Sequence, residues 1–170
     1  MRIITGSARG TRLKSPAGDG TRPTADRTRE ALFSMLGSRV VDARVLDLFA
    51  GTGALALEAL SRGAASAVLV DRTTHAILAE NAARTKLAGC AEIRRGDVYA
   101  VAAELAREGR TFDLIFADPP YAHGDNARVL EAAARGSLLA AGGLLVLEQG
   151  AGEEIVPQAG ALRLMRERRY

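Results

Sequence analysis

Residues 47 to 58 read DLFAGTGALALE, a segment in which a short apolar strand runs through two glycines into a helical pattern. Gly51 and Gly53 allow a tight turn and the close approach of a ligand, and the helix after them presents free backbone N–H groups. Gly51, Gly53 and Ala56 also match the dinucleotide-binding pattern G-x-G-x-x-G/A, although this spacing alone is weak evidence. The segment therefore predicts a strand, turn and helix that bind a ligand.

The chain after this segment continues to alternate between apolar strands and helices. Strands are expected at residues 45–49, 67–70, 91–95, 112–117 and 144–149. Helices are expected at residues 54–60, 74–87, 98–108 and 127–136. This order is typical of a parallel sheet covered by helices on both faces, so the sequence predicts an α/β, Rossmann-like, doubly wound and mostly parallel fold.

Ahead of this alternation lies a basic segment, residues 1–39, which predicts a small β-hairpin around Gly6 and Gly10 and then a helix that begins near Asp26. We expect this extension to precede one compact unit formed by residues 40–170. The extension carries eight Lys or Arg against three Asp or Glu, which favours a polyanionic partner over a merely solvated surface. The candidate residues for contact with that polyanion are Arg2, Arg9, Arg12, Lys14, Arg22, Arg27 and Arg29.

Composition excludes several other classes of protein. The chain has 170 residues, of which 48% are hydrophobic, as expected for one globular domain. No apolar run approaches the roughly 20 residues that cross a bilayer, and the N-terminus lacks the apolar core of a signal peptide, so we expect a cytoplasmic protein with no membrane partner. Cys90, His75 and His123 are isolated from one another, so we expect no metal site, and we expect Cys90 to be buried.

Acidic residues follow two further strands. In open α/β sheets, ligands bind outside the carboxyl ends of the strands. Asp71 follows the second expected strand, where a carboxylate can accept both ribose hydroxyls of a nucleoside and would repel a 2′-phosphate, which disfavours NADP. Asp97 follows the third strand, where it can accept a hydrogen bond from an adenine amine. Either residue alone is equally well explained as a solvated loop acid.

The fourth expected strand ends in DPPY, residues 118–121. Two prolines fix the backbone and cannot continue a strand or a helix, so the segment is either a simple strand stop or a stiff binding ledge. As a ledge, the Asp118 carboxylate and the Pro119 carbonyl would accept hydrogen bonds from a planar amine. Tyr121 would stack on the ring, a contact that contributes about 1–3 kcal/mol per base in nucleic-acid complexes.

With DLFAGTG at residues 47–53 and DPPY at residues 118–121, the chain resembles the class I S-adenosylmethionine-dependent methyltransferases. RPTADRTRE at residues 22–30 resembles, more narrowly, the RsmD family, whose members methylate N2 of a guanine in 16S ribosomal RNA of the small subunit. The resemblance covers nearly the whole chain. Members of the family continue beyond the position of Tyr170 into a final strand, so we expect either a truncated chain or an incomplete terminal hairpin.

The resemblance implies a set of ligands and site residues. The cofactor would be S-adenosyl-L-methionine, without a metal, and the partner would be 16S ribosomal RNA, bare or within a small-subunit particle, bound by a monomer. The implied cofactor-binding residues are Asp47, Phe49, Ala50, Gly51, Gly53, Asp71, Arg72, Asp97, Val98 and Asp118. The implied catalytic residues, which contact the base, are Asp118, Pro119, Pro120 and Tyr121.

Three alternatives stay open at this point. DPPY serves any planar amine, so the chain could instead be an adenine-N6 DNA methyltransferase or a glutamine-N5 protein methyltransferase. An NAD-binding oxidoreductase is disfavoured because no well-placed His, Lys or Tyr accompanies the glycines as a general acid. A non-catalytic RNA-binding module is disfavoured because both the glycine turn and the DPPY ledge are intact.

Overall fold

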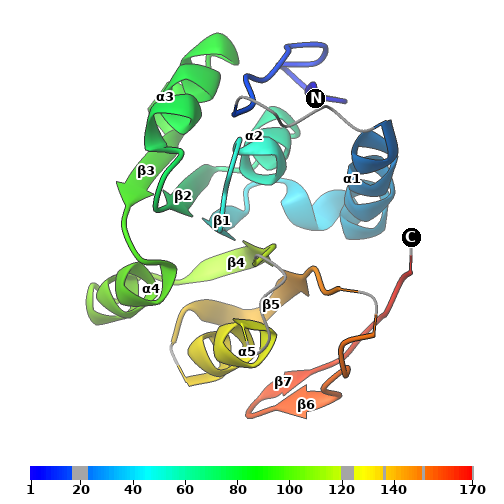
Figure 1. Cartoon of the computed structure of the whole chain (residues 1–170), viewed down its shortest axis with the longest axis vertical. Helices are drawn as coiled ribbons and strands as arrows, with labels where there is room; N and C mark the ends of the chain where they lie inside the picture. The colour runs from blue at the N-terminus through cyan, green and yellow to red at the C-terminus, as the bar shows by residue number, and fades with distance from the viewer. Residues whose placement is uncertain (17–22, 120–124, 136, 151, 170) are drawn as a thin grey trace.

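The computed structural model describes residues 1–16, 23–119, 125–135, 137–150 and 152–169. Its centre is a five-stranded sheet in the order β3-β2-β1-β4-β5, in which every pair of neighbours is parallel (Figure 1). The strands are β1 (Arg44–Leu48), β2 (Ser66–Asp71), β3 (Ala91–Arg95), β4 (Phe112–Ala117) and β5 (Leu139–Leu147). The predicted α/β fold with a parallel sheet is confirmed.

Helices cover both faces of this sheet (Figure 1). They are α1 (Pro23–Leu36), α2 (Ala54–Ser61), α3 (His75–Arg84), α4 (Val98–Arg107) and α5 (Asp125–Arg135), with short 3-10 helices η1 (Gly37–Val40) and η2 (Ala88–Cys90). Figure 1 shows α1, α2 and α3 on one face and α4 and α5 on the other. The chain is therefore doubly wound, as the alternation of elements predicts.

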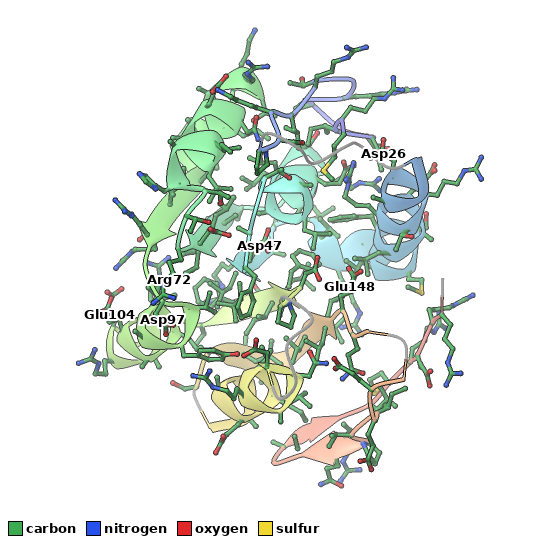
Figure 2. The ribbon with its side chains drawn as sticks, in the orientation of Figure 1. Asp26, Asp47, Arg72, Asp97, Glu104 and Glu148 are labelled. Carbon is green, nitrogen blue, oxygen red and sulfur yellow. The ribbon has the colours of Figure 1, made fainter. Side chains whose placement is uncertain are left out.

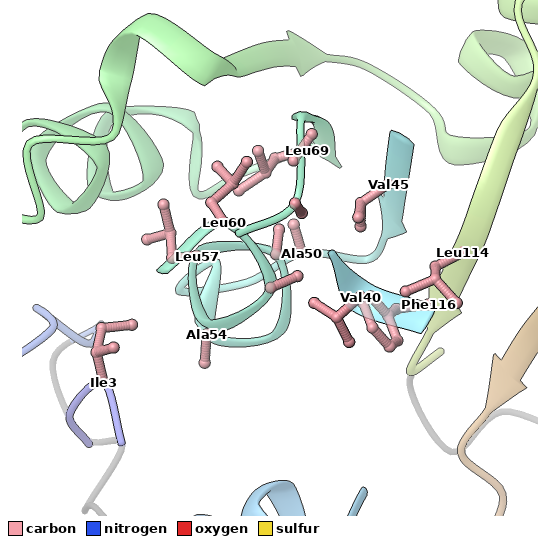
Figure 3. Close-up of a cluster of buried hydrophobic side chains, with 14 of the residues drawn as sticks. Ile3, Val40, Val45, Ala50, Ala54, Leu57, Leu60, Leu69, Leu114 and Phe116 are labelled. Atoms are coloured by element: carbon pink, nitrogen blue, oxygen red, sulfur yellow. The ribbon is translucent and has the colours of Figure 1, made fainter. Parts of the chain in front are cut away.

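Each face of the sheet has its own hydrophobic core, because successive strand residues point to opposite faces. Val45 packs in the cluster under α1, α2 and α3, together with Leu57 and Leu69 (Figure 3). Its neighbour Leu46 packs in the cluster under α4 and α5, together with Val101. Burial on both faces explains why the strands read as continuous apolar runs rather than as an alternation.

Three element boundaries differ from the prediction by three residues or more. Helix α1 begins at Pro23 rather than near Asp26, since proline fits the first helical turn, where its missing N–H costs nothing. Helix α3 ends at Arg84, and Lys86 follows with a φ of 60°. Strand β5 begins at Leu139 rather than at residue 144, and its pairing with β4 shifts register within that added length.

The N-terminal segment, residues 1–14, folds back on itself as predicted, but with a single antiparallel bridge, Arg2 to Arg12, in place of two strands. The Ile3 N–H donates to the Thr11 carbonyl at 3.0 Å, and the Gly10 N–H donates to the Ile3 carbonyl at 2.8 Å. Ile3 is fully buried in the cluster under α1, α2 and α3. We call residues 1–14 the basic arm. The division of the chain at residue 39 stays a proposal.

Two further features, the C-terminal strand pair and the exposure of Cys90, were not predicted from the sequence. Strands β6 (Gln158–Ala159) and β7 (Leu162–Arg163) form a separate antiparallel pair. Cys90 is exposed, and its predicted burial was wrong, because it lies in η2 at the surface entry to β3 rather than on a core-facing position. None of the helices within the described residues has both the length and the apolar character to span a membrane.

Candidate active site

The carboxyl ends of the parallel strands bring the predicted acidic residues to one edge of the sheet, and Figure 2 labels Asp47 and Asp97 among them. Asp47 lies within β1, Asp71 ends β2, Asp97 follows β3 and Asp118 follows β4. The strand order reverses between β1 and β4, because the chain builds β2 and β3 on one side of β1 and then crosses to the other. This is the position at which open α/β sheets bind ligands.

The turn between β1 and α2 depends on both of its glycines, for different reasons. Gly51 has a φ of 55° and Gly53 a φ of 78°, both in the left-handed region that favours glycine. A Cβ atom on Gly53 would lie 3.0 Å from side-chain carbons of Leu69 and Leu78. A Cβ atom on Gly51 would meet nothing closer than the Phe49 carbonyl oxygen, at 3.9 Å. Gly53 thus lets α2 pack on the core, whereas Gly51 leaves an open approach to the backbone.

The Asp71 side chain lies beside this turn and is hydrogen-bonded to it. The Gly51 N–H donates to Asp71 Oδ2 at 3.0 Å, and the N–H groups of Thr73 and Thr74 donate to Oδ1 at 2.8 and 3.0 Å. Burial alone would raise the pKa of Asp71, but these hydrogen bonds favour the charged form and lower it. Asp71 is therefore an ionised acceptor, held in place, with a lone pair left on Oδ2, which accepts only one of these hydrogen bonds.

Asp47 is the buried acid of the site, with 2% of its surface exposed. Burial raises the pKa of Asp47 to about 7, against a hydrogen bond from the Ala56 N–H at 3.1 Å that lowers it. The charges of Asp118 and Asp71 raise it further. Near neutral pH, the site therefore stabilises the charged form of Asp47 poorly, unless a cation lies close to it.

Asp118 is exposed to solvent on one side, and the next residue, Pro119, is buried. Partial loss of hydration raises the pKa of Asp118 to about 6, and the charge of Glu148 adds to this effect. Glu148 follows β5 and is held there by its N–H, which donates to the Ala117 carbonyl at 2.9 Å. Sequence reasoning missed Glu148, although an acid directly after the last strand was a usable signal. Pro120 and Tyr121 lie outside the described residues.

The remaining predicted cofactor residues surround the same edge. Asp97 caps α4, because its Oδ1 accepts the N–H groups of Tyr99 and Ala100, both at 3.1 Å. Asp97 itself is exposed, and Val98 beside it is buried. Arg72, labelled in Figure 2, is exposed in the loop after β2. This loop is tied to the β3 loop by a hydrogen bond from the Gly96 N–H to the Asp71 carbonyl at 3.3 Å.

An aromatic cluster that the sequence did not reveal stands beside Asp97. The Phe49 ring, on a residue with a φ of 64°, meets the Tyr99 ring edge-on, with centroids 6.1 Å apart. The Tyr99 hydroxyl donates to Asp125 Oδ1 at 3.0 Å, and the Arg128 guanidinium lies 3.9 Å above the Tyr99 ring. The cluster ties the β1 turn to the starts of α4 and α5. No local pattern in the sequence could have linked residues this far apart.

The basic arm and α1 form a second candidate surface. Arg2, Arg9 and Arg27 are exposed and line a cavity of about 340 Å³ between the arm and α1, together with Asp26 and Glu30. Arg12 is exposed as well. Lys14 is also exposed, but its Nζ lies 2.6 Å from Glu80 Oε2 on α3. Arg22 lies outside the described residues.

Arg29 does not belong to this exposed surface. Only 4% of it is accessible, its guanidinium donates to the Arg2 carbonyl and to Asp26 Oδ1, and its Nε lies 3.7 Å from Glu58 Oε2. Burial of Arg29 leaves no face for a phosphate. We therefore correct its predicted role and assign Arg29 to the attachment of the arm to α1 and α2. Sequence reasoning missed this because charge alone does not show which face of a helix is covered.

Comparison with known proteins places the chain in a family. The family model described as "Conserved hypothetical protein 95" matches residues 1–170. The chain belongs to this family. It is 36% identical to "Putative rRNA methyltransferase YlbH" of Bacillus subtilis over 172 residues, which cover 100% of this chain and 94% of that protein. The predicted resemblance to the RsmD family is confirmed.

Two further relatives extend this comparison. "Ribosomal RNA small subunit methyltransferase D" of Escherichia coli is 45% identical over 126 residues, which cover 73% of this chain and 62% of that protein. A solved structure, "Putative methyltransferase yhhF from Escherichia coli", superposes with a TM-score of 0.79 at 38% identity and covers 92% of this chain and 85% of that one. The fold is thus shared with named methyltransferases across most of its length.

The described residues offer no competing metal centre. Within the ranges that the structure describes, no three His, Cys, Asp or Glu side chains are grouped so that they could hold a metal ion. The charges of Asp71 and Asp118 raise the pKa of Asp47, but Asp71 accepts hydrogen bonds from backbone N–H groups and Asp47 accepts one from the Ala56 N–H. At this edge of the sheet, Asp47 and Asp71 are therefore positioned by hydrogen bonds from backbone N–H groups.

Proposed function

We propose that this chain transfers a methyl group from S-adenosyl-L-methionine to the exocyclic N2 amine of a guanine in 16S ribosomal RNA. The observation that carries the proposal is the position of Asp118 and Pro119 at the end of β4, beside the open Gly51 turn at the end of β1. A planar amine and a methyl donor would meet between these two strand ends. The names of the relatives support ribosomal RNA as the substrate class.

The acidic edge fits the proposed cofactor. S-adenosyl-L-methionine supplies a methyl group on a positively charged sulfonium, so it needs alignment more than chemical activation. The pKa values of Asp47 and Asp118 are raised, to about 7 and about 6, and a bound cation would relieve that cost. We assign the ribose hydroxyls to Asp71, whose ionised carboxylate has acceptor capacity left.

The remaining proposed contacts to the cofactor come from the loops that follow β1, β2 and β3. Phe49, Ala50, Gly51 and Gly53 form the turn that would approach its amino-acid part, and Asp47 lies beneath them. Arg72, Asp97 and Val98 stand where the adenine would lie, beyond the ends of β2 and β3. Gly51 is the residue at which the backbone is open to a ligand.

On the substrate side, Asp118 would orient the amine. Its carboxylate accepts one N–H of the amine, which directs the nitrogen lone pair towards the methyl group. Once the nitrogen has gained the methyl group, it carries an extra proton, and Asp118, with a pKa of about 6, is placed to accept that proton and pass it to solvent. Pro119 presents its carbonyl as a second acceptor, and Pro120 and Tyr121 complete the proposed ledge. A flipped guanine would lose stacking worth a few kcal/mol, which contacts in the site offset.

The basic arm is the proposed contact to the RNA backbone. Arg2, Arg9, Arg12 and Arg27 are exposed, and within the described part of the chain none of them forms an ion pair. Lys14 can contribute only by sharing its charge with Glu80. Arg22 is kept in the proposed set. Because the substrate is ribosomal RNA, we also propose that the protein acts in the cytoplasm.

Methyl incorporation tests this function directly. Purified protein and labelled S-adenosyl-L-methionine are incubated separately with bare 16S RNA, assembled small-subunit particles, duplex DNA and a protein extract. We expect label in RNA or in particles, and N2-methylguanine after nucleoside digestion. Label only in DNA as N6-methyladenine, or only in protein, would replace the proposal with one of the two alternative methyltransferases, because the Asp118 ledge suits any planar amine.

A further inference from the structure

Asn81, on α3, joins the basic arm to the turn between β1 and α2. Its side chain is fully buried, with 0% of its surface exposed. Its Oδ1 accepts the Lys14 N–H at 2.7 Å, and its Nδ2 donates both to the Lys14 carbonyl and to the Thr52 carbonyl, each at 2.9 Å. Both Nδ2 hydrogens are thus used, one on each side.

The two partners of Asn81 belong to the two proposed binding surfaces. Lys14 is the last residue of the basic arm, and Thr52 lies between Gly51 and Gly53 in the proposed cofactor turn. A second contact connects the same surfaces, since the Thr52 hydroxyl lies 3.5 Å from Met1 Sδ. The arm and the turn, although 38 residues apart in sequence from Lys14 to Thr52, therefore share one buried hydrogen-bond network.

Such a network resists the movement of one partner without the other. A buried polar group that loses its hydrogen bond costs more than the bond contributes when it is formed, because no water replaces the lost partner. If the Thr52 carbonyl is fixed by a ligand in the turn, the Asn81 amide is fixed with it. The Lys14 backbone then loses freedom as well.

We propose that Asn81 is a positioning residue that sets the basic arm against the cofactor turn, so that occupation of the turn steadies the arm for the RNA. The inference rests on the proposed function for the identity of the two ligands. Its physical content, a link between the turn and the arm, is independent of which RNA is modified and can be measured without RNA.

Ser61 on α2 offers a matched control. It is also buried, with 4% of its surface exposed, and its hydroxyl likewise makes two hydrogen bonds to the arm: it accepts the Ala8 N–H at 2.9 Å and donates to the Thr5 carbonyl at 2.6 Å. No described hydrogen bond joins the Ser61 side chain to the Gly51–Gly53 turn. Ser61→Ala and Asn81→Ala therefore remove the same number of arm contacts, but only Asn81→Ala removes the link to the turn.

The experiment is amide hydrogen exchange with and without saturating S-adenosylhomocysteine, the demethylated product of the cofactor. In the wild type, we expect exchange of the Lys14 amide, and of the amides of residues 11–13 beside it, to slow by about fivefold or more on binding, the lower end of common coupling between sites. The Ala8 amide, held by Ser61, should slow less. Asn81→Ala should abolish the effect across residues 11–13, while Ser61→Ala should keep it at Lys14.

Other results would overturn the proposal. If S-adenosylhomocysteine binds the wild type by calorimetry but leaves Lys14 exchange unchanged, the link does not exist, and this wild-type result decides the question even if Asn81→Ala fails to fold. If both variants lose the effect equally, Asn81 has only a structural role. If S-adenosylhomocysteine does not bind at all, the proposed function fails and the coupling fails with it, whereas intact methyl transfer without slowed exchange removes the coupling alone.

Discussion

The carboxyl edge of the sheet and the basic arm both concentrate charge of one sign, but they hold it differently. At the edge, Asp47 is buried and Asp118 is partly desolvated beside Glu148, so the pKa values of both aspartates are raised. On the arm, Arg2, Arg9 and Arg12 project into solvent. Ionisation of the acids at the edge therefore costs free energy, which a cationic ligand would recover. The arginines of the arm stay hydrated, so their charge costs little in the free protein and can attract a polyanion.

The two regions are also anchored differently. The acids at the edge are positioned by the strands that end there and by backbone N–H groups of the turns. The arm lies outside the sheet and is fastened instead by buried side chains of α1, α2 and α3. Glu58, with no exposed surface, accepts the N–H groups of Ile4 and Thr5 at 2.8 and 3.0 Å and pairs with Arg62. Glu58 looks like surface charge in the sequence, but it is therefore a buried structural group that holds the arm.

The largest effect should follow from removing the acid at the end of β4. Asp118→Ala should reduce methyl transfer by about 100-fold or more, the usual loss when one hydrogen-bonding group that acts on the reacting atoms is removed, with only a modest loss of cofactor affinity. Turnover is measured by methyl incorporation and cofactor affinity by calorimetry. Asp113→Asn, at the opposite end of the same strand, serves as the control and should keep activity. Near-normal turnover by Asp118→Ala would remove Asp118 from the mechanism.

A smaller effect should appear in the free energy of unfolding, because the buried charge of Asp47 destabilises the folded protein. The pKa of Asp47 is about 7 in the folded state and about 4 when unfolded, so the wild type loses stability as pH rises from about 4 to about 7. Asp47→Asn cannot titrate. At pH 8 and without cofactor, it should exceed the wild type by about 2 kcal/mol or more in free energy of unfolding, and at pH 4 it should match it.

Denaturant titrations at the two pH values measure this difference. The control is again Asp113→Asn, which should act in the opposite direction. Hydrogen bonds from Arg44 lower the pKa of Asp113, so the contribution of that carboxylate is present above its unfolded pKa and is lost as pH falls. If Asp47→Asn were less stable than the wild type at pH 8, the charge of Asp47 would already be compensated within the protein.

Substitutions at the two glycines of the turn should distinguish a loss of packing from a loss of ligand binding. Gly53→Ala should cost about 1–2 kcal/mol for the left-handed backbone and more for crowding against Leu69 and Leu78. Gly51→Ala carries the backbone cost alone, so it should be more stable than Gly53→Ala but bind the cofactor less well than the wild type. Melting temperature and calorimetry distinguish the two. Equal losses of stability would mean that the space beside Gly53 adjusts freely.

The smallest change in free energy is expected on the arm, where it appears as a salt dependence. Arg9→Ala combined with Arg12→Ala should flatten the slope of log affinity against log salt by about 0.7 to 0.9 per lost phosphate contact. Cofactor affinity should not change. Arg39→Ala combined with Arg107→Ala removes two exposed arginines, from η1 and α4, that form no ion pair within the described residues, and is the matched control. An unchanged slope in a folded arm variant would place the RNA surface elsewhere, with residues 163–169 as the next candidate.

Much of the fold and part of the site could be read from the sequence, because the signals were local. Buried parallel strands read as apolar runs, helices as amphipathic segments between them, and the first acid after a strand marks the binding edge. This was enough to place Asp71, Asp97 and Asp118 correctly relative to the sheet. The start of β5 was missed because Ala140, Ala141 and two glycines carry no strand signal of their own. Only Leu139 before them pairs with β4, opposite Phe112, and these four residues lie in the register shift that follows.

The sequence by itself determined which residues carry charge and where the strands end, since both are properties of short segments. Only the tertiary structure decided what surrounds each charge. Arg29 and Arg9 look alike in the sequence, yet one is buried against Glu58 and the other is exposed. Asn81 carries no motif, yet it joins Lys14 to Thr52. Hydration and hydrogen bonding depend on neighbours that the fold brings together from distant parts of the chain, and these neighbours set whether a polar residue binds, titrates or only holds the structure.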